Sequence, residues 1–128
     1  MISKELLSQV LDKKVVVDDI SNIELKENTI TFIEDYWDED EGSGFYRSHT
    51  INIYELAHKC KEWAVNLSPN KHALSSYPRW GDIRNYKKTN GSYYICQHLV
   101  SGVQFEAETE PEAIFKACEW VLEQVGKK

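Results

Sequence analysis

Residues 50–67 read TINIYELAHKCKEWAVNL and residues 106–125 read EAETEPEAIFKACEWVLEQV, and these two stretches decide the fold. Each begins with strand-like residues, continues with a polar residue that can cap a helix, and ends in an amphipathic run. The pattern predicts a strand followed by a helix in both places. Short alternating segments lie between them, so we expect the order α-β-β-β-α for the second half.

The helix starts carry recognisable capping residues. Asn52 and Glu55 form one capping-box-like pair, Thr109 and Glu112 form another, and Pro111 falls in the first turn, where its missing N–H is harmless. On a helical wheel the residues expected to face the core are Ile53, Leu56, Ala57, Cys60, Trp63, Ala64 and Leu67 in the first of these helices, and Ile114, Cys118, Val121, Leu122 and Val125 in the second.

The first half is predicted to hold a helix and several strands. Ser3 caps a helix that runs to about Leu11, with Ile2 and Leu7 spaced as a hydrophobic staple. The expected strands are Lys13 to Val17, a hairpin of Ile23–Leu25 and Ile30–Phe32 that turns at Glu27-Asn28, and Phe45 to Ile51. Residues 68–91 are polar and rich in turn residues, and two more strands are expected near Tyr93–His98 and Val103–Glu108.

This order predicts an α+β protein forming a single domain over residues 1–128. We expect an antiparallel sheet of five to seven strands covered by about three helices, in the order α-β-β-β-β-α-β-β-(β)-α.

Composition restricts the functional classes. The 128 residues carry a net charge of −6, which disfavours a dedicated nucleic-acid binder because such proteins neutralise phosphates. No apolar run approaches the roughly 18 residues of a membrane span, and the N-terminus lacks a secretory signal, so a cytoplasmic protein is expected. The three cysteines, Cys60, Cys96 and Cys118, form no CxxC pair, and Cys60 and Cys118 are expected to be buried free thiols.

Two resemblances follow from these segments. The second half is similar in layout to a double-stranded-RNA-binding domain, but residues 108–113 are acidic where that family has a basic cluster, so RNA binding by this face is not expected. Residues 51–64 and 110–120 also resemble recurring elements of small uncharacterised bacterial and prophage-encoded proteins, and the layout resembles helix–sheet–helix sandwich domains of phage accessory proteins. No functional residue carries over from these families.

One stretch is strongly acidic. Six of the eight residues from Glu34 to Glu41 are Asp or Glu, and glycines follow, which indicates an exposed loop or a frayed hairpin tip. A solvated loop, a partner-binding patch and a metal site are the alternatives, and the EF-hand spacing fails. The residues proposed for partner binding are Asp35, Tyr36, Trp37, Asp38, Glu39, Asp40 and Glu41. Tyr36 and Trp37 would either anchor a partner or fold back on the sheet.

A second stretch, residues 71–88, combines basic and aromatic residues. Arg79, Trp80, Arg84, Lys87 and Lys88 are the candidates for a nucleic-acid or nucleotide-binding surface. The alternatives are an ordinary polar loop and a segment that pairs with the acidic stretch of a second copy in a homo-oligomer.

No pattern of a known catalytic site appears. The sequence lacks GxSxG, HExxH, P-loop and GxGxxG motifs, and Cys96 with His98 would need two more ligands to bind zinc. We therefore expect no enzymatic activity, no cofactor and no metal. The preferred hypothesis is a phage-derived accessory or anti-defence inhibitor whose acidic loop binds a basic protein surface; the alternatives are the nucleic-acid-binding module and a structural or oligomerisation domain.

Overall fold

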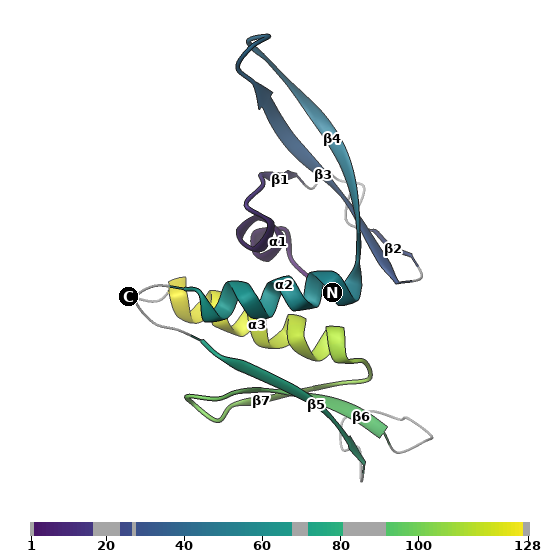
Figure 1. The fold of residues 1–128 in the computed structure, drawn as a ribbon, viewed down its shortest axis with the longest axis vertical. Helices are drawn as coiled ribbons and strands as arrows, with labels where there is room; N and C mark the ends of the chain where they lie inside the picture. Colours follow the sequence, from purple (N-terminus) through teal and green to yellow (C-terminus); the bar gives the residue numbers. More distant parts are fainter. Residues whose placement is uncertain (1, 17–23, 27, 68–71, 81–91, 127–128) are drawn as a thin grey trace.

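The computed structural model describes residues 2–16, 24–26, 28–67, 72–80 and 92–126. Three helices and seven strands follow one another along these residues (Figure 1). In order they are α1 (Lys4–Leu11), β1 (Val15–Val16), β2 (Glu24–Lys26), β3 (Thr29–Asp38), β4 (Ser43–Asn52), α2 (Ile53–Val65), β5 (Leu74–Trp80), β6 (Ser92–His98), β7 (Gln104–Ala107) and α3 (Glu110–Gly126).

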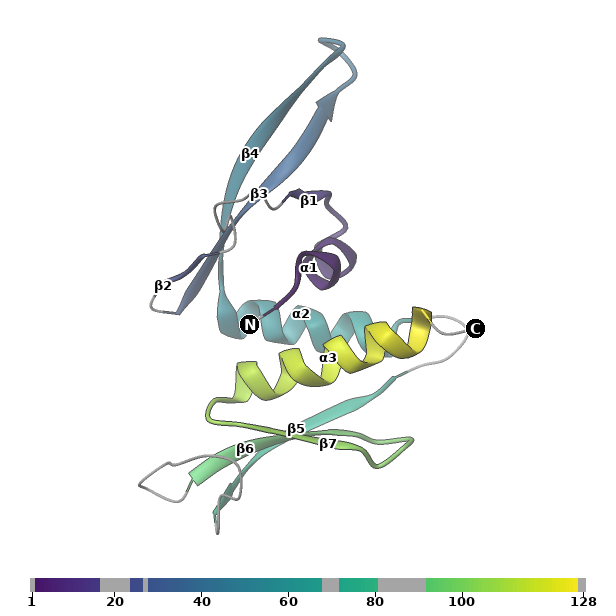
Figure 2. The ribbon, with the colours of Figure 1, turned by 180° about the vertical axis from the view of Figure 1, so that it is seen from behind.

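The α+β class and the order of elements are confirmed, but the expectation of one sheet is wrong. Sheet A has four strands, with β3 pairing β1 and β2 along one edge and β4 along the other, whereas sheet B has the order β5-β6-β7. The helices form a layer between the two sheets (Figures 1 and 2). Helix α2 follows β4 without a loop, so it carries the chain away from sheet A before β5 begins.

The predicted helix caps are present. The Ser3 hydroxyl accepts the N–H of Leu6 at 3.1 Å, and the Asn52 side chain accepts the N–H groups of Tyr54 and Glu55 at 2.8 and 3.3 Å. Thr109 accepts the N–H of Glu112 at 3.4 Å. These bonds satisfy backbone donors that a helix leaves unpaired, which is why each helix begins where the sequence predicts.

The core lies where the helix layer meets the two sheets. Helices α2 and α3 bury small residues against each other, including Cys60, Ala64, Ala117 and Cys118, all of them 0% exposed. The burial of Cys60 and Cys118 confirms the prediction of free thiols that behave as small apolar groups. The predicted core-facing residues of α3 are wrong at Val125, which is 45% exposed. Those of α2 extend too far, because Leu67 lies beyond the end of the helix at Val65.

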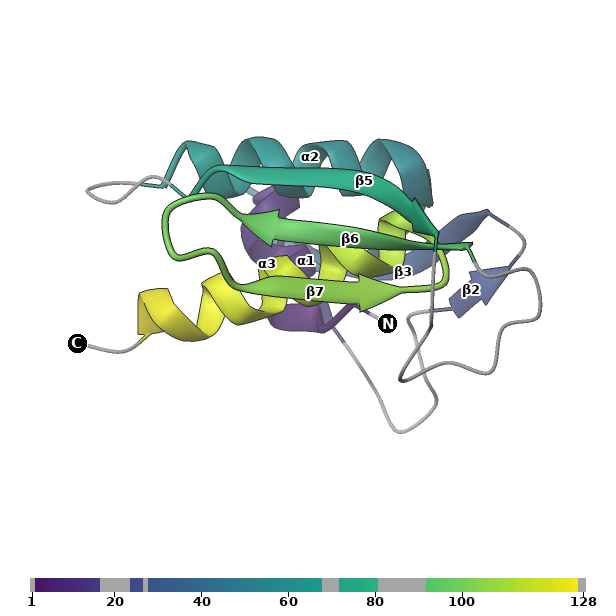
Figure 3. The same ribbon diagram turned by 90° about the horizontal axis from the view of Figure 1, so that it is seen from below.

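The segment 74–80 is a strand, although its composition predicted a polar, turn-rich connection. Strand β5 pairs with β6 from Leu74↔His98 to Trp80↔Ser92 and forms an edge of sheet B (Figure 3). The N–H of Leu99 donates to the carbonyl of Ala73, so in this ladder the odd-numbered β5 residues face β6 and Pro78 points to the open edge. Proline is tolerated there because it has no N–H to lose.

Candidate functional site

The longest strand pair forms a projecting arm. We define the arm as residues 35–46, the outer part of the β3–β4 hairpin, whose strands pair from Thr29↔Asn52 to Asp38↔Ser43. Residues 39–42 make the turn, where Gly42 has φ +66°, a conformation that favours glycine. Figures 1 and 2 show this end of the hairpin extending beyond α1, away from the helix layer. The acidic stretch is therefore mostly strand. Of the two predicted alternatives, the exposed loop holds only for residues 39–41, and the hairpin tip describes the turn that they form.

Large aromatic side chains are exposed on the arm. Trp37 is 61% exposed and Tyr46 is 69% exposed, and register places both on one face of the hairpin. On the opposite face Tyr36 and Phe45 pack with ring centroids 5.1 Å apart, and the Arg47 guanidinium lies 3.4 Å from the centre of the Tyr36 ring. Of the two predicted aromatics, Tyr36 is thus partly covered, whereas Trp37 is open to a partner.

The predicted acidic residues divide into different environments. Glu39, Asp40 and Glu41 are exposed in the turn, and Asp38 ends β3, with its side chain outside the described atoms. Asp35 Oδ2 lies 3.3 Å from Nζ of Lys14, the residue that directly precedes β1. Carboxylates thus gather at the same end of the hairpin as the exposed aromatic rings, an arrangement that favours a positively charged partner.

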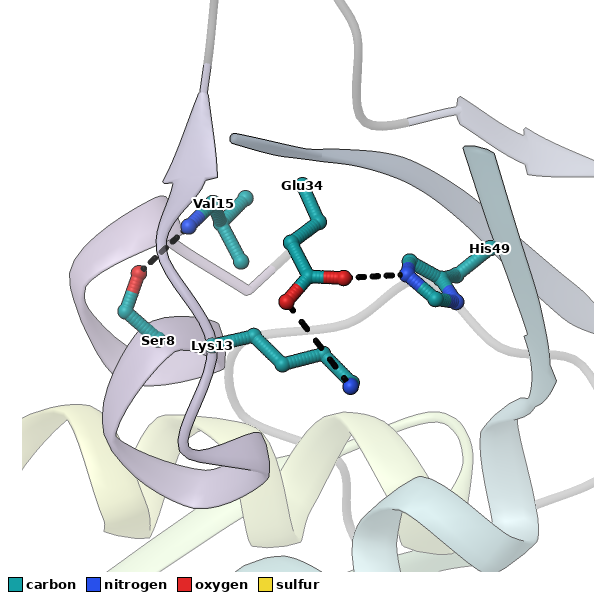
Figure 4. A network of polar contacts seen from close by, with 5 residues as sticks. All are labelled: Ser8, Lys13, Val15, Glu34 and His49. Atoms are coloured by element: carbon teal, nitrogen blue, oxygen red, sulfur yellow. Dashed lines mark hydrogen bonds and ion pairs between the residues drawn. The ribbon is translucent and has the colours of Figure 1, made fainter. Parts of the chain in front are cut away.

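Glu34 belongs to a different site. It is 8% exposed, its Oε1 lies 2.8 Å from His49 Nε2, and its Oε2 lies 3.9 Å from Lys13 Nζ (Figure 4). Ser8 accepts the N–H of Val15 beside it and fixes the approach of β1. This network ties β3 and β4 to the segment after α1. It therefore holds the base of the arm against the body of the protein.

A cleft of about 570 Å³ opens beside this network. It lies between α1, α2 and the inner face of sheet A, and Phe32, Ile51 and Trp63 supply apolar lining while Lys59 and Glu62 supply charges. The volume falls within the range of small-ligand pockets, but the charges along it are of both signs and select no ligand class. Nothing in the sequence indicated this cleft, because residues of four separate elements, α1, β3, β4 and α2, line it.

The alternative binding set is only partly described. Arg79 is exposed on β5, and Trp80 ends that strand with its side chain outside the described atoms. Arg84, Lys87 and Lys88 lie outside the described residues. The structure therefore does not test whether these five residues form one surface, and the nucleic-acid hypothesis stays a prediction.

Cys96 and His98 are both buried in β6 but face different surroundings. Burial raises the pKa of the Cys96 thiol to about 12, which keeps it protonated and poorly nucleophilic. His98 Nδ1 accepts the Ser101 N–H at 3.2 Å, its Nε2 lies 2.9 Å from His72 Nδ1, and its ring packs on Trp120. Sequence reasoning missed this His72–His98–Ser101 network, since His72 is far away along the chain.

Comparison with known proteins identifies no relative: no family model, no curated protein and no solved structure matches this chain. The resemblance to phage accessory proteins therefore stays a prediction. Within the described ranges, no three His, Cys, Asp or Glu side chains come together as a metal site. None of the described helices combines the length and the apolar character that a membrane span requires.

Proposed function

We propose that the chain is a non-enzymatic binding protein whose arm occupies a positively charged surface of a partner protein. The observation that carries this proposal is the exposure of Trp37 and Tyr46, at 61% and 69%, on a hairpin end that also bears the acidic turn. Solvated acidic loops are common, but large exposed aromatics beside them cost free energy unless a partner covers them. Aromatic residues are also the usual anchors of protein interfaces.

Charge and packing have separate roles in this proposal. The carboxylates of Glu39, Asp40 and Glu41 would steer the arm to a basic surface and make association sensitive to salt. Trp37 would provide the anchor, since a buried interface tryptophan commonly contributes about 2 kcal/mol or more. Following the resemblance to phage accessory proteins, we propose that the partner is a cytoplasmic host protein, such as a defence protein, that the arm inhibits.

Affinity capture from a bacterial lysate tests the proposal. The tip variant Glu39→Gln/Asp40→Asn/Glu41→Gln should lose the captured protein, and so should Trp37→Ala. The matched control Glu5→Gln/Glu112→Gln/Glu123→Gln removes the same charge from exposed helix positions and should retain it. Bound protein should be released as the salt concentration rises from about 50 to about 500 mM, because this increase shortens the electrostatic screening length several-fold. Capture that is unchanged in the tip variant would refute the proposal.

A further inference from the structure

Within the described part of the chain, strand β4 has an open edge along its whole length. Among the described residues β4 pairs with β3 alone, while β1 and β2 pair with the far edge of β3. No described helix or strand runs beside this edge in Figure 1 or Figure 2. The edge is ten residues long, from Ser43 to Asn52, which is long for an uncovered strand.

Two hydrogen bonds establish which backbone groups point outward. The Ile53 N–H donates to the Asn28 carbonyl at 2.8 Å, on the side of β4 that faces β3. Residues of an antiparallel ladder alternate in direction, so the odd-numbered residues of β4 face β3. The N–H and C=O groups of Gly44, Tyr46, Ser48 and Thr50 therefore point to the open edge. The Asp35 N–H, which donates to Lys14 on the opposite side of β3, agrees with this alternation.

The edge lacks the features that usually block strand addition. Residues 43–52 contain no proline and no lysine, and the one arginine, Arg47, places its guanidinium over the Tyr36 ring. Strand β5, one of the two edge strands of sheet B, carries Pro78 at an outward-pointing position. The chain thus has a proline at this edge of sheet B and none at the β4 edge of sheet A.

We propose that β4 binds its partner by strand addition, taking an extended segment with basic residues as the next strand of sheet A. This inference rests on the proposed function and specifies its mode of recognition. A strand beside β4 would continue past Ser43 and meet the acidic turn at residues 39–42, so basic residues are expected at that end of the segment. A second copy of this chain is a poorer occupant than a basic segment, because each copy carries a net charge of −6 and the two copies would repel each other.

A synthetic peptide of alternating valine and lysine provides the probe, with binding measured by fluorescence anisotropy. Ser48→Pro removes an outward-pointing N–H without removing a bond to β3, so it should weaken binding about tenfold. Ser48→Thr keeps the N–H and should bind like the wild type. A peptide N-methylated at every residue has no N–H on either edge, so it should also bind weakly to the wild-type protein. This second test does not depend on how the proline variant folds.

Three outcomes would overturn the inference. If the N-methylated peptide binds as tightly as the parent peptide, charge alone holds the probe. If Ser48→Pro, with an unchanged circular dichroism spectrum, still binds the peptide while the tip variant does not, the proposed function stands and strand addition is wrong. If sedimentation shows a wild-type dimer that Ser48→Pro dissociates, the edge serves a second copy instead.

Discussion

Replacing Phe32 by alanine tests whether apolar packing at the base of the arm holds the arm in place. Phe32 is 2% exposed, and its ring stacks on His49 with centroids 5.2 Å apart. A phenylalanine buries about 200 Å² or more, equivalent to about 5 kcal/mol at ~25 cal/mol per Å². Phe32 lines the neighbouring cleft, so the side chains around it have room to relax after the substitution. We therefore expect the free energy of unfolding to fall by about 3 kcal/mol, near the lower end of the usual range for this substitution.

Urea unfolding followed by circular dichroism measures this loss. With a slope of about 1.5 kcal/mol per molar, the midpoint should fall by about 2 M urea. Tyr46→Ala is the matched control, because Tyr46 is a 69% exposed aromatic on the same hairpin, and it should change the free energy of unfolding by less than about 0.5 kcal/mol. A loss below about 1 kcal/mol for Phe32→Ala, or an equal loss in the control, would show that Phe32 does not anchor the hairpin.

Three further predictions concern the polar contacts. Burial, followed by the charge of His72, lowers the pKa of His98, so the contribution of His98 to the free energy of unfolding should be fully present above about pH 6.5 and be lost as the pH falls below that value. Urea midpoints measured across pH should show this dependence reduced in His98→Gln but kept in the control His58→Gln. Equal pH dependence in the two variants would contradict the prediction. Asn52→Ala removes the cap of α2 and should cost about 1 kcal/mol of unfolding free energy, and an unchanged thermal midpoint would count against the cap. Glu34→Ala should lower the free energy of unfolding by about 1–2 kcal/mol, and its effect should not add to that of His49→Ala in a double-mutant cycle. Simple addition of the two effects would mean that the 2.8 Å contact between Glu34 Oε1 and His49 Nε2 contributes nothing to stability.

The arm shows which part of the candidate site could be predicted from the sequence. The sequence singled out the acidic residues and the nearby Tyr36 and Trp37 as a partner-binding patch, because composition alone sets charge and aromatic content. It placed Glu34 and Glu39 in one exposed acidic stretch, although Glu34 is buried against His49 and only Glu39 is exposed. That difference depends on where α1 and β1 cover the hairpin, which is a tertiary property.

The missed strand β5 has the same explanation. Its residues lack a clear alternating pattern, and Pro78 argues against a central strand, so local propensity predicted a turn-rich connection. The segment becomes a strand because β6 provides a ladder of partners for it.

Local sequence was sufficient for the helix starts and for the order of most elements. A cap such as Ser3 or Asn52 acts within three residues, and an amphipathic stripe depends only on spacing along one helix. The division into two sheets, the cleft and the open edge of β4 were decided by the tertiary structure alone. Each depends on which distant segments meet, and the hydrogen bonds and buried area that select those meetings exist only once the chain has folded.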